Sequence, residues 1–258
     1  MEEDYSIVTE LPGFKGSKEQ LTRLYQRYRF ARDFCKDKEV LEVACGGGMG
    51  LGYLAKVAKK VIGGDLDKEI LKHPLERYDG RGKIEIKEFD AQTLPFEDKS
   101  FDVVILYEAI YYLTEPEKFV SEAHRVLRDD GVLLTCTANK DWADFNPSPY
   151  STKYFSAQEL YSLLKRKFTQ IKVFGAFPVS ESGVKNKIVS LIKRTAVSLH
   201  LIPKTMKGKE IFKRLFFGKL LTLPAEIEDG EFEYSPPEAI SSDSPNSLYK
   251  VLFSVANV

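Results

Sequence analysis

The feature that most restricts the fold of this chain is a glycine-rich turn that follows an apolar strand and precedes a helix. It reads Val40-Leu-Glu-Val-Ala-Cys-Gly-Gly-Gly-Met-Gly50. Glycines let the backbone turn sharply and approach a ligand, and free N–H groups at the helix start can hold a negative group. The nicotinamide dinucleotide fingerprint needs glycine at its sixth position, but counting from Gly46 that position is Leu51. The turn also lacks the Gly-Lys-Ser/Thr of a P-loop, so both of these nucleotide sites are excluded.

Short apolar runs alternate with helix-like segments from residue 39 to residue 177, which indicates a parallel sheet with crossover helices. Strands are predicted near 40–45, 61–65, 83–89, 101–107, 131–138 and 170–177. Helices are predicted near 50–60, 67–77, 116–128 and 156–167, and a further helix follows the capping box at Ser17. We expect Pro74 to break the second of the four. After Phe177 the alternation stops until residues 248–255, which form one more strand-like run.

The charges of the 258-residue chain cancel, because it has 38 basic and 38 acidic residues. No global field favours nucleic acid, so no nucleic-acid partner is expected. Cys35, Cys45 and Cys136 are too few and too scattered for a disulfide framework or a Cys-x-x-Cys metal site. The acidic N-terminus differs from a secretion signal, and no apolar run approaches about 18 residues. We therefore expect a cytoplasmic, soluble protein without a metal, which can still touch the inner face of a membrane.

The segment Glu42-Val-Ala-Cys-Gly-Gly-Gly48 resembles motif I of the class I S-adenosylmethionine-dependent methyltransferases, which usually reads Asp/Glu-x-Gly-x-Gly-x-Gly. Ala44 replaces the first glycine, a small change because alanine is also small. The strand ending at Asp65, the segment from Asp90 to Phe96 and the segments 100–113 and 119–131 follow in the order of that family's further motifs. The resemblance covers about residues 27 to 177.

This resemblance, to a methyltransferase type 11-like domain, implies an α/β fold with a Rossmann-like, doubly wound, mostly parallel seven-stranded sheet. A helical insertion is expected between the last two strands. The domains expected are a lid or packing helix (1–36), a cofactor-binding methyltransferase domain (37–178 with 246–258) and an inserted cap or substrate region (179–245). S-adenosyl-L-methionine is the implied cofactor.

The resemblance also implies how the cofactor is held. Asp65 lies nineteen residues after Gly46, where Rossmann-type folds place a carboxylate for a ribose diol, although a helix N-cap is its alternative role. Asp90 is expected to receive the adenine amino group, and a surface turn is its alternative. Glu42 is expected to hold the ammonium end indirectly. The expected cofactor-binding residues are Tyr28, Glu42, Ala44, Gly46, Gly48, Asp65, Leu66, Asp90, Ala91 and Tyr107.

Methyl transfer from a sulfonium is an in-line displacement whose leaving group is already activated, so the protein mainly aligns the reactants and a base is optional. A hydroxyl acceptor would benefit from a base. The candidates are Glu108, Tyr112 and Asp141, with Tyr111 and Asp144 beside them, and the sequence does not choose among them. The three histidines are interpreted as structural or solvated.

The acceptor is the least determined part of the interpretation. The loop 138–150, which contains Trp142, Phe145 and Tyr150, is the main candidate for the substrate loop. Three functions stay open: a methyltransferase of a small-molecule or glycan acceptor, one of a lipid-linked or quinone-like acceptor, and a cofactor-binding module without catalysis. The basic segment 185–219 fits two amphipathic helices, which either cap the substrate crevice or contact an anionic membrane.

Overall fold

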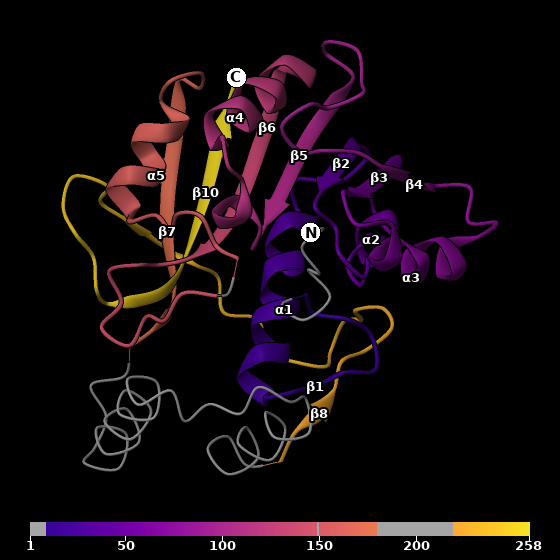
Figure 1. Cartoon of the computed structure of the whole chain (residues 1–258), viewed down its shortest axis with the longest axis horizontal. Helices are drawn as coiled ribbons and strands as arrows, with labels where there is room; N and C mark the ends of the chain where they lie inside the picture. The colour runs from indigo at the N-terminus through magenta and orange to yellow at the C-terminus, as the bar shows by residue number, and fades with distance from the viewer. Residues whose placement is uncertain (1–8, 149, 180–218) are drawn as a thin grey trace.

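The computed structural model describes residues 9–148, 150–179 and 219–258, and these contain an eight-stranded sheet in the order β4-β3-β2-β5-β6-β10-β7-β9 (Figure 1). The strands are β2 (Glu39–Val43), β3 (Lys60–Asp65), β4 (Ile84–Glu88), β5 (Phe101–Tyr107), β6 (Leu127–Ala138), β7 (Gln170–Pro178), β9 (Glu238–Ile240) and β10 (Tyr249–Asn257). Strands β2 to β6 pair in parallel, whereas β10 lies antiparallel between β6 and β7. The predicted Rossmann-like α/β class is confirmed, with the short edge strand β9 added to the seven expected strands.

Five α-helices are described: α1 (Lys18–Arg32), α2 (Leu51–Ala55), α3 (Lys68–Tyr78), α4 (Pro116–Val126) and α5 (Ala157–Leu164). A short 3₁₀-helix, η2, covers Ile110–Tyr112. Side chains of α1, α2 and α3 join one apolar cluster with the sheet, and side chains of α4 and α5 join the other. Two separate clusters place helices on both faces of the sheet, as a doubly wound fold requires.

Local side-chain contacts set where the helices begin. The Ser17 hydroxyl accepts from the amide of Gln20 at 3.1 Å, and the Asp67 carboxylate caps α3 by accepting from the amide of Glu69 at 2.9 Å. The prediction for Pro74 was wrong, because this residue lies inside α3 and is buried there. Proline has no N–H, so α3 lacks one helical hydrogen bond at Pro74, but only one more turn of helix follows. The Pro74 ring packs against the glycine turn.

The region predicted as a helical insertion is only partly described. Residues 180–218, and with them nearly all of the basic segment 185–219, lie outside the described residues. Residues 219–245 contain two short strands, β8 (Leu221–Thr222) and β9, and no helix. Among the described residues, no helix has the length and apolar character needed to cross a membrane.

A second, two-stranded sheet joins the N-terminal part of the described chain to the segment that begins at residue 219. Strand β1 (Lys15–Gly16) pairs antiparallel with β8, beside the start of α1 (Figure 1). We call residues 9–16 the N-terminal strap. After β8, Leu223 and Ile227 are buried in the core, and the Ile227 amide donates to the Met49 carbonyl at 3.0 Å. The chain that leaves the insertion is thereby fixed against the glycine turn.

Candidate functional site

The turn after β2 has the backbone geometry of a ligand-binding loop. Ala44, Gly46 and Gly48 have φ values of 54°, 54° and 67°. A Cβ atom on Gly48 would lie 2.6 Å from the Cβ of Pro74, so only glycine fits there. Ala44 is the exception to the motif, and the structure shows that its position is a left-handed one, where a methyl group is strained.

Two side chains of helix α3 form hydrogen bonds with the backbone of this glycine loop. The Tyr78 hydroxyl donates to the Gly48 carbonyl at 2.8 Å and accepts from the Gly52 amide at 3.2 Å. The Arg77 guanidinium donates to the Gly47 carbonyl at 3.1 Å. Sequence reasoning missed both supports, because the only signal in the sequence is a polar pair at the end of a helix, which is common.

The Asp65 carboxylate connects the end of β3 to the glycine loop. One oxygen accepts from the Gly46 amide at 2.9 Å and the other from the Asp67 amide at 3.1 Å. Burial raises the pKa of Asp65, and these backbone hydrogen bonds oppose the rise. Asp67 occupies the N-cap, so the capping alternative for Asp65 is not needed. Each carboxylate oxygen accepts one backbone hydrogen bond and keeps a further lone pair, as the predicted ribose contact requires.

Asp90 lies close to Asp65 along the same sheet edge, because the amide of Phe89 donates to the Asp65 carbonyl at 3.1 Å. The Asp90 carboxylate accepts from the Gln92 amide at 2.8 Å. Asp90 is therefore part of a turn, which was the alternative role considered for it from the sequence. Leu66 is 60% exposed and Ala91 is buried. The four predicted residues therefore sit together at one edge, with an apolar side chain open to solvent beside two carboxylates.

Glu42 and Tyr28 form a buried, hydrogen-bonded pair next to the glycine loop. The Tyr28 hydroxyl donates to Oε1 of Glu42 at 2.5 Å, while Oε2 of Glu42 is buried without a hydrogen-bond partner among the described residues. Burial raises the pKa of Glu42 to about 7, although Tyr28 and Arg27 act in the opposite direction. A Cβ atom on Gly50 would lie 1.8 Å from the Tyr28 ring, so the ring rests directly on the glycine loop.

Tyr107 and Glu108 end β5 next to this pair. The Tyr107 ring packs edge-on against Tyr28 with 6.0 Å between centroids, and its buried hydroxyl has no partner within the described part of the chain. Glu108 has a φ of 52°, and its amide donates to the Cys136 carbonyl at 2.7 Å. The Glu108 carboxylate accepts from the Tyr111 hydroxyl at 3.2 Å. A non-glycine residue held in this conformation at a strand end is typical of functional sites.

The other two predicted base candidates have different surroundings. The Tyr112 hydroxyl lies 2.8 Å from the Ser148 hydroxyl, in the predicted substrate loop. The Asp141 amide donates to the Asn139 side chain at 3.1 Å, and Oδ2 of Asp141 is buried without a partner among residues that the structure describes. Among the described residues, no hydrogen bond or ion pair joins Asp141 to Glu108. The structure thus brings Glu108, rather than Asp141, next to the predicted cofactor residues.

The N-terminal strap lies across the glycine loop, which the sequence did not predict. A Cβ atom on Gly47 would lie 2.8 Å from Cδ of Pro12, and one on Gly46 would lie 3.1 Å from Cγ2 of Thr9. Glu10 of the strap pairs with Arg27 of α1 at 2.5 Å. Nothing in the sequence pattern marked Glu10 or Arg27, because the two residues meet only when the strap folds back over the loop.

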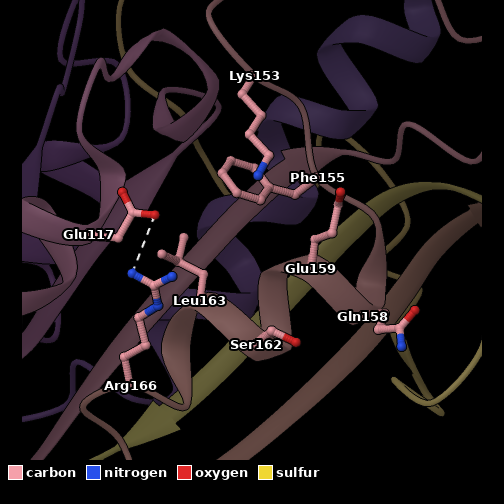
Figure 2. A pocket seen from close by; sticks show the side chains of 8 residues that line it. All are labelled: Glu117, Lys153, Phe155, Gln158, Glu159, Ser162, Leu163 and Arg166. Carbon is pink, nitrogen blue, oxygen red and sulfur yellow. Dashed lines mark ion pairs between the residues drawn. The ribbon is translucent and has the colours of Figure 1, made fainter.

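A surface recess of about 260 Å³ lies away from these residues. Its lining comes from α4, from residues 153–155, from α5 and from Arg166, which follows α5. Figure 2 shows Glu117 and Arg166 pointing toward each other, and their charged atoms are 3.5 Å apart. None of the predicted site residues lines this recess. The candidate site is therefore the glycine loop, where the predicted residues converge.

The fold occurs in solved methyltransferase structures. One is described as an S-adenosylmethionine-dependent methyltransferase, possible histamine N-methyltransferase, from Thermotoga maritima. It matches with a TM-score of 0.59 and 15% identity, over 92% of this chain and 91% of its own. At this identity the likeness shows the fold alone.

Two curated relatives come from Mycolicibacterium smegmatis. A probable S-adenosylmethionine-dependent methyltransferase is 37% identical over 137 residues, 51% of this chain and 51% of that protein. A fatty-acid O-methyltransferase is 38% identical over 99 residues, 38% of this chain and 36% of that protein. This chain spans about half the length, or less, of these relatives.

The fold, the glycine loop and these likenesses define a class I S-adenosylmethionine-dependent methyltransferase domain, as the sequence predicted. Residues 41–135 match the family model described as methyltransferase domain. The cofactor is therefore S-adenosyl-L-methionine.

The residues of the site fit this cofactor. The unpartnered, buried oxygen of Glu42 is suited to a cationic group such as the methionyl ammonium. The carboxylates of Asp65 and Asp90 lie at one edge, as ribose and adenine contacts require. These individual roles stay predictions, which the variants described below test.

Proposed function

We propose that the protein transfers a methyl group from S-adenosylmethionine to a hydroxyl oxygen of a small-molecule or glycan acceptor, with Glu108 as the general base. The observation that carries this proposal is the position of Glu108. It follows β5 directly and accepts from Tyr111, and it neighbours Tyr107, whose ring packs on Tyr28. Among the candidates, Glu108 lies next to the predicted cofactor residue Tyr107, and a hydrogen bond from Tyr111 holds its carboxylate.

The chemistry asks little of the protein beyond alignment. When bound, the cofactor supplies a methyl group on a positively charged sulfur, which needs no further activation. Glu42 and Tyr28 orient the methionyl end, and Asp65 and Asp90 orient the nucleoside end. The Glu108 carboxylate then accepts the proton of the acceptor hydroxyl as the oxygen attacks, and Tyr111 holds that carboxylate in place.

Calorimetry and labelled transfer test this function in sequence. S-adenosylmethionine and its demethylated product are expected to bind with one-to-one stoichiometry, while NAD and ATP do not bind. Radiolabelled methyl transfer to fractionated cell extract then identifies the acceptor fraction. Glu108→Gln is expected to lower kcat by about 10²–10⁴-fold without weakening binding of the demethylated product. Glu117→Gln, on the exposed face of α4, is the matched control.

The outcomes separate the alternatives. Cofactor binding without transfer to any fraction would support a cofactor-binding module that lacks catalysis. Undiminished turnover in Glu108→Gln would show that Glu108 is not the base, because removal of an essential proton acceptor cannot leave kcat unchanged.

A lipid acceptor is the second candidate, because a relative is named a fatty-acid O-methyltransferase. The basic segment 185–219 is the part of the chain that would contact an anionic bilayer, at roughly 1 kcal/mol for each lysine or arginine near the surface. Co-sedimentation with anionic liposomes at low and at physiological salt tests this version. Label in the organic extract and binding to vesicles would support it, and failure to bind at either salt would remove it.

A further inference from the structure

Arg27 has a buried charge that the proposed transfer step does not use. Its side chain is 8% exposed, and it extends from α1 toward the ends of β5 and β6. Nη2 lies 2.5 Å from Oε2 of Glu10, and Nη1 lies 3.9 Å from Oε1 of Glu108. Burial alone would lower the pKa of Arg27, but these two carboxylates raise it, so the guanidinium stays charged. A buried charge of this kind needs an anionic partner at all times.

The nearer partner, Glu10, belongs to the N-terminal strap rather than to the main sheet. Its side chain is 26% exposed, and Oε1 accepts from the Gln20 side chain at 2.9 Å. Apart from Glu10, the strap joins the rest of the molecule through the small β1–β8 pair, backbone hydrogen bonds with Leu223, the buried Leu11 and contacts on the glycine loop. Glu10 can therefore leave Arg27 without disturbing any strand of the main sheet.

Glu10 does not fill the binding capacity of the guanidinium. Nε of Arg27 is buried and has no hydrogen-bond partner among the residues described, and the Glu10 bond is to Nη2. Carboxylates and phosphates bind arginine best as bidentate ligands, with two parallel N–H bonds. Glu10 thus occupies one half of a two-point anion site.

We propose that Arg27 binds a carboxylate or phosphate group of the methyl acceptor, and that Glu10 holds this position until the acceptor arrives. The inference rests on the proposed transfer function and adds a substrate class to it: acceptors that carry an anionic group near the methylated oxygen. Arg27 precedes Tyr28, which rests on the glycine loop, and Nη1 of Arg27 lies 3.9 Å from Oε1 of Glu108, the proposed base. An anion bound there fixes the acceptor between the cofactor and the base.

The test follows the Nε–H signal of Arg27 by NMR, in protein labelled with ¹⁵N-arginine and saturated with S-adenosylhomocysteine. Arg27→Lys assigns the signal by removing it. Acetate and inorganic phosphate are expected to shift the signal with a saturable dependence, and the neutral isostere acetamide is not. The stronger of the two anions indicates whether the acceptor group is a carboxylate or a phosphate.

Two variants make the test sharp. Glu10→Gln removes the competing charge and is expected to tighten anion binding about tenfold, as for one charge-assisted hydrogen bond. A variant that merely destabilises the fold would not gain affinity. Arg29→Gln removes an arginine from the same helix, where its partner Asp33 is exposed, and is expected to leave anion binding unchanged.

Three results would overturn the inference. Acetamide shifting the signal as acetate does would show that no charge is recognised, and unchanged affinity in Glu10→Gln would show that Glu10 holds no ligand position. If Arg27→Lys weakens S-adenosylhomocysteine but not methylthioadenosine, which lacks the amino-acid end, Arg27 holds the cofactor carboxylate instead. Failure of the wild type to bind S-adenosylhomocysteine would refute the proposed function itself.

Discussion

Glu42 is expected to make the fold less stable as the pH rises, and Glu42→Gln is expected to remove this effect. Burial raises the pKa of Glu42 from 4.5 to about 7. One pKa unit corresponds to about 1.4 kcal/mol, so ionising this carboxyl in the folded state costs about 3 kcal/mol. The folded state binds the proton more tightly than the unfolded state, so the cost is absent below about pH 4.5 and complete above about pH 7.

The assay is urea denaturation, followed by circular dichroism, across this pH range. Glu42→Gln is expected to be about 3 kcal/mol more stable than the wild type at about pH 8 and nearly equal to it at about pH 4.5. Glu39→Gln, on the same strand, is the control with the opposite sign. Hydrogen bonds from Lys59 and Arg128 lower the pKa of Glu39 to about 2, so its removal should destabilise at both pH values.

The reasoning fails if the stability difference between Glu42→Gln and the wild type does not change with pH. Such a result would mean that Glu42 does not titrate in this range. The variant should also bind S-adenosylmethionine more weakly than the wild type, because the carboxylate expected to face the methionyl ammonium is gone. A more stable protein that binds its cofactor less well is the combined signature to look for.

Three further variants test the cofactor site. Asp65→Asn should weaken S-adenosylmethionine binding at least about tenfold by calorimetry, because charge-assisted hydrogen bonds contribute about 1.5–3 kcal/mol each; unchanged affinity would refute the ribose contact. Asp90→Ala should weaken the whole cofactor but not a fragment without adenine, and equal losses would indicate a structural role. Ala44→Gly should raise the free energy of unfolding in urea by up to about 1 kcal/mol, because φ is 54° there; a loss would contradict the strain.

The sheet could be predicted closely from the sequence because its signals are local. The apolar runs of strand length lie within a few residues of the observed strands. The glycine turn indicated where the first crossover helix begins. Helix α2 was predicted over 50–60 but covers Leu51–Ala55, since the chain must reach β3 at Lys60. Pro74 misled the prediction because its packing against Gly48 is a tertiary contact.

The cofactor edge was visible in the sequence, whereas the residues that surround it were not. Asp65 and Asp90 follow strands at a fixed spacing, so a pattern can find them. Glu10 and Arg27 are seventeen positions apart on a strap and a helix, and their pairing depends on how the strap crosses the loop. The choice of Glu108 over Asp141 likewise needed the fold, because both are acids in loops that follow a strand.

The position of β10 in the sheet governs the order in which this protein can be completed during synthesis. Strand β7 pairs only with β10 and β9 among the described strands, and both emerge from the ribosome long after β7 does. Until β10 is made, the backbone of β7 and the edge of β6 that faces β10 have no strand to pair with. Open edges of this kind are prone to aggregate, so a nascent chain paused between residues 178 and 249 would depend on chaperones, although β2 to β6 are already made.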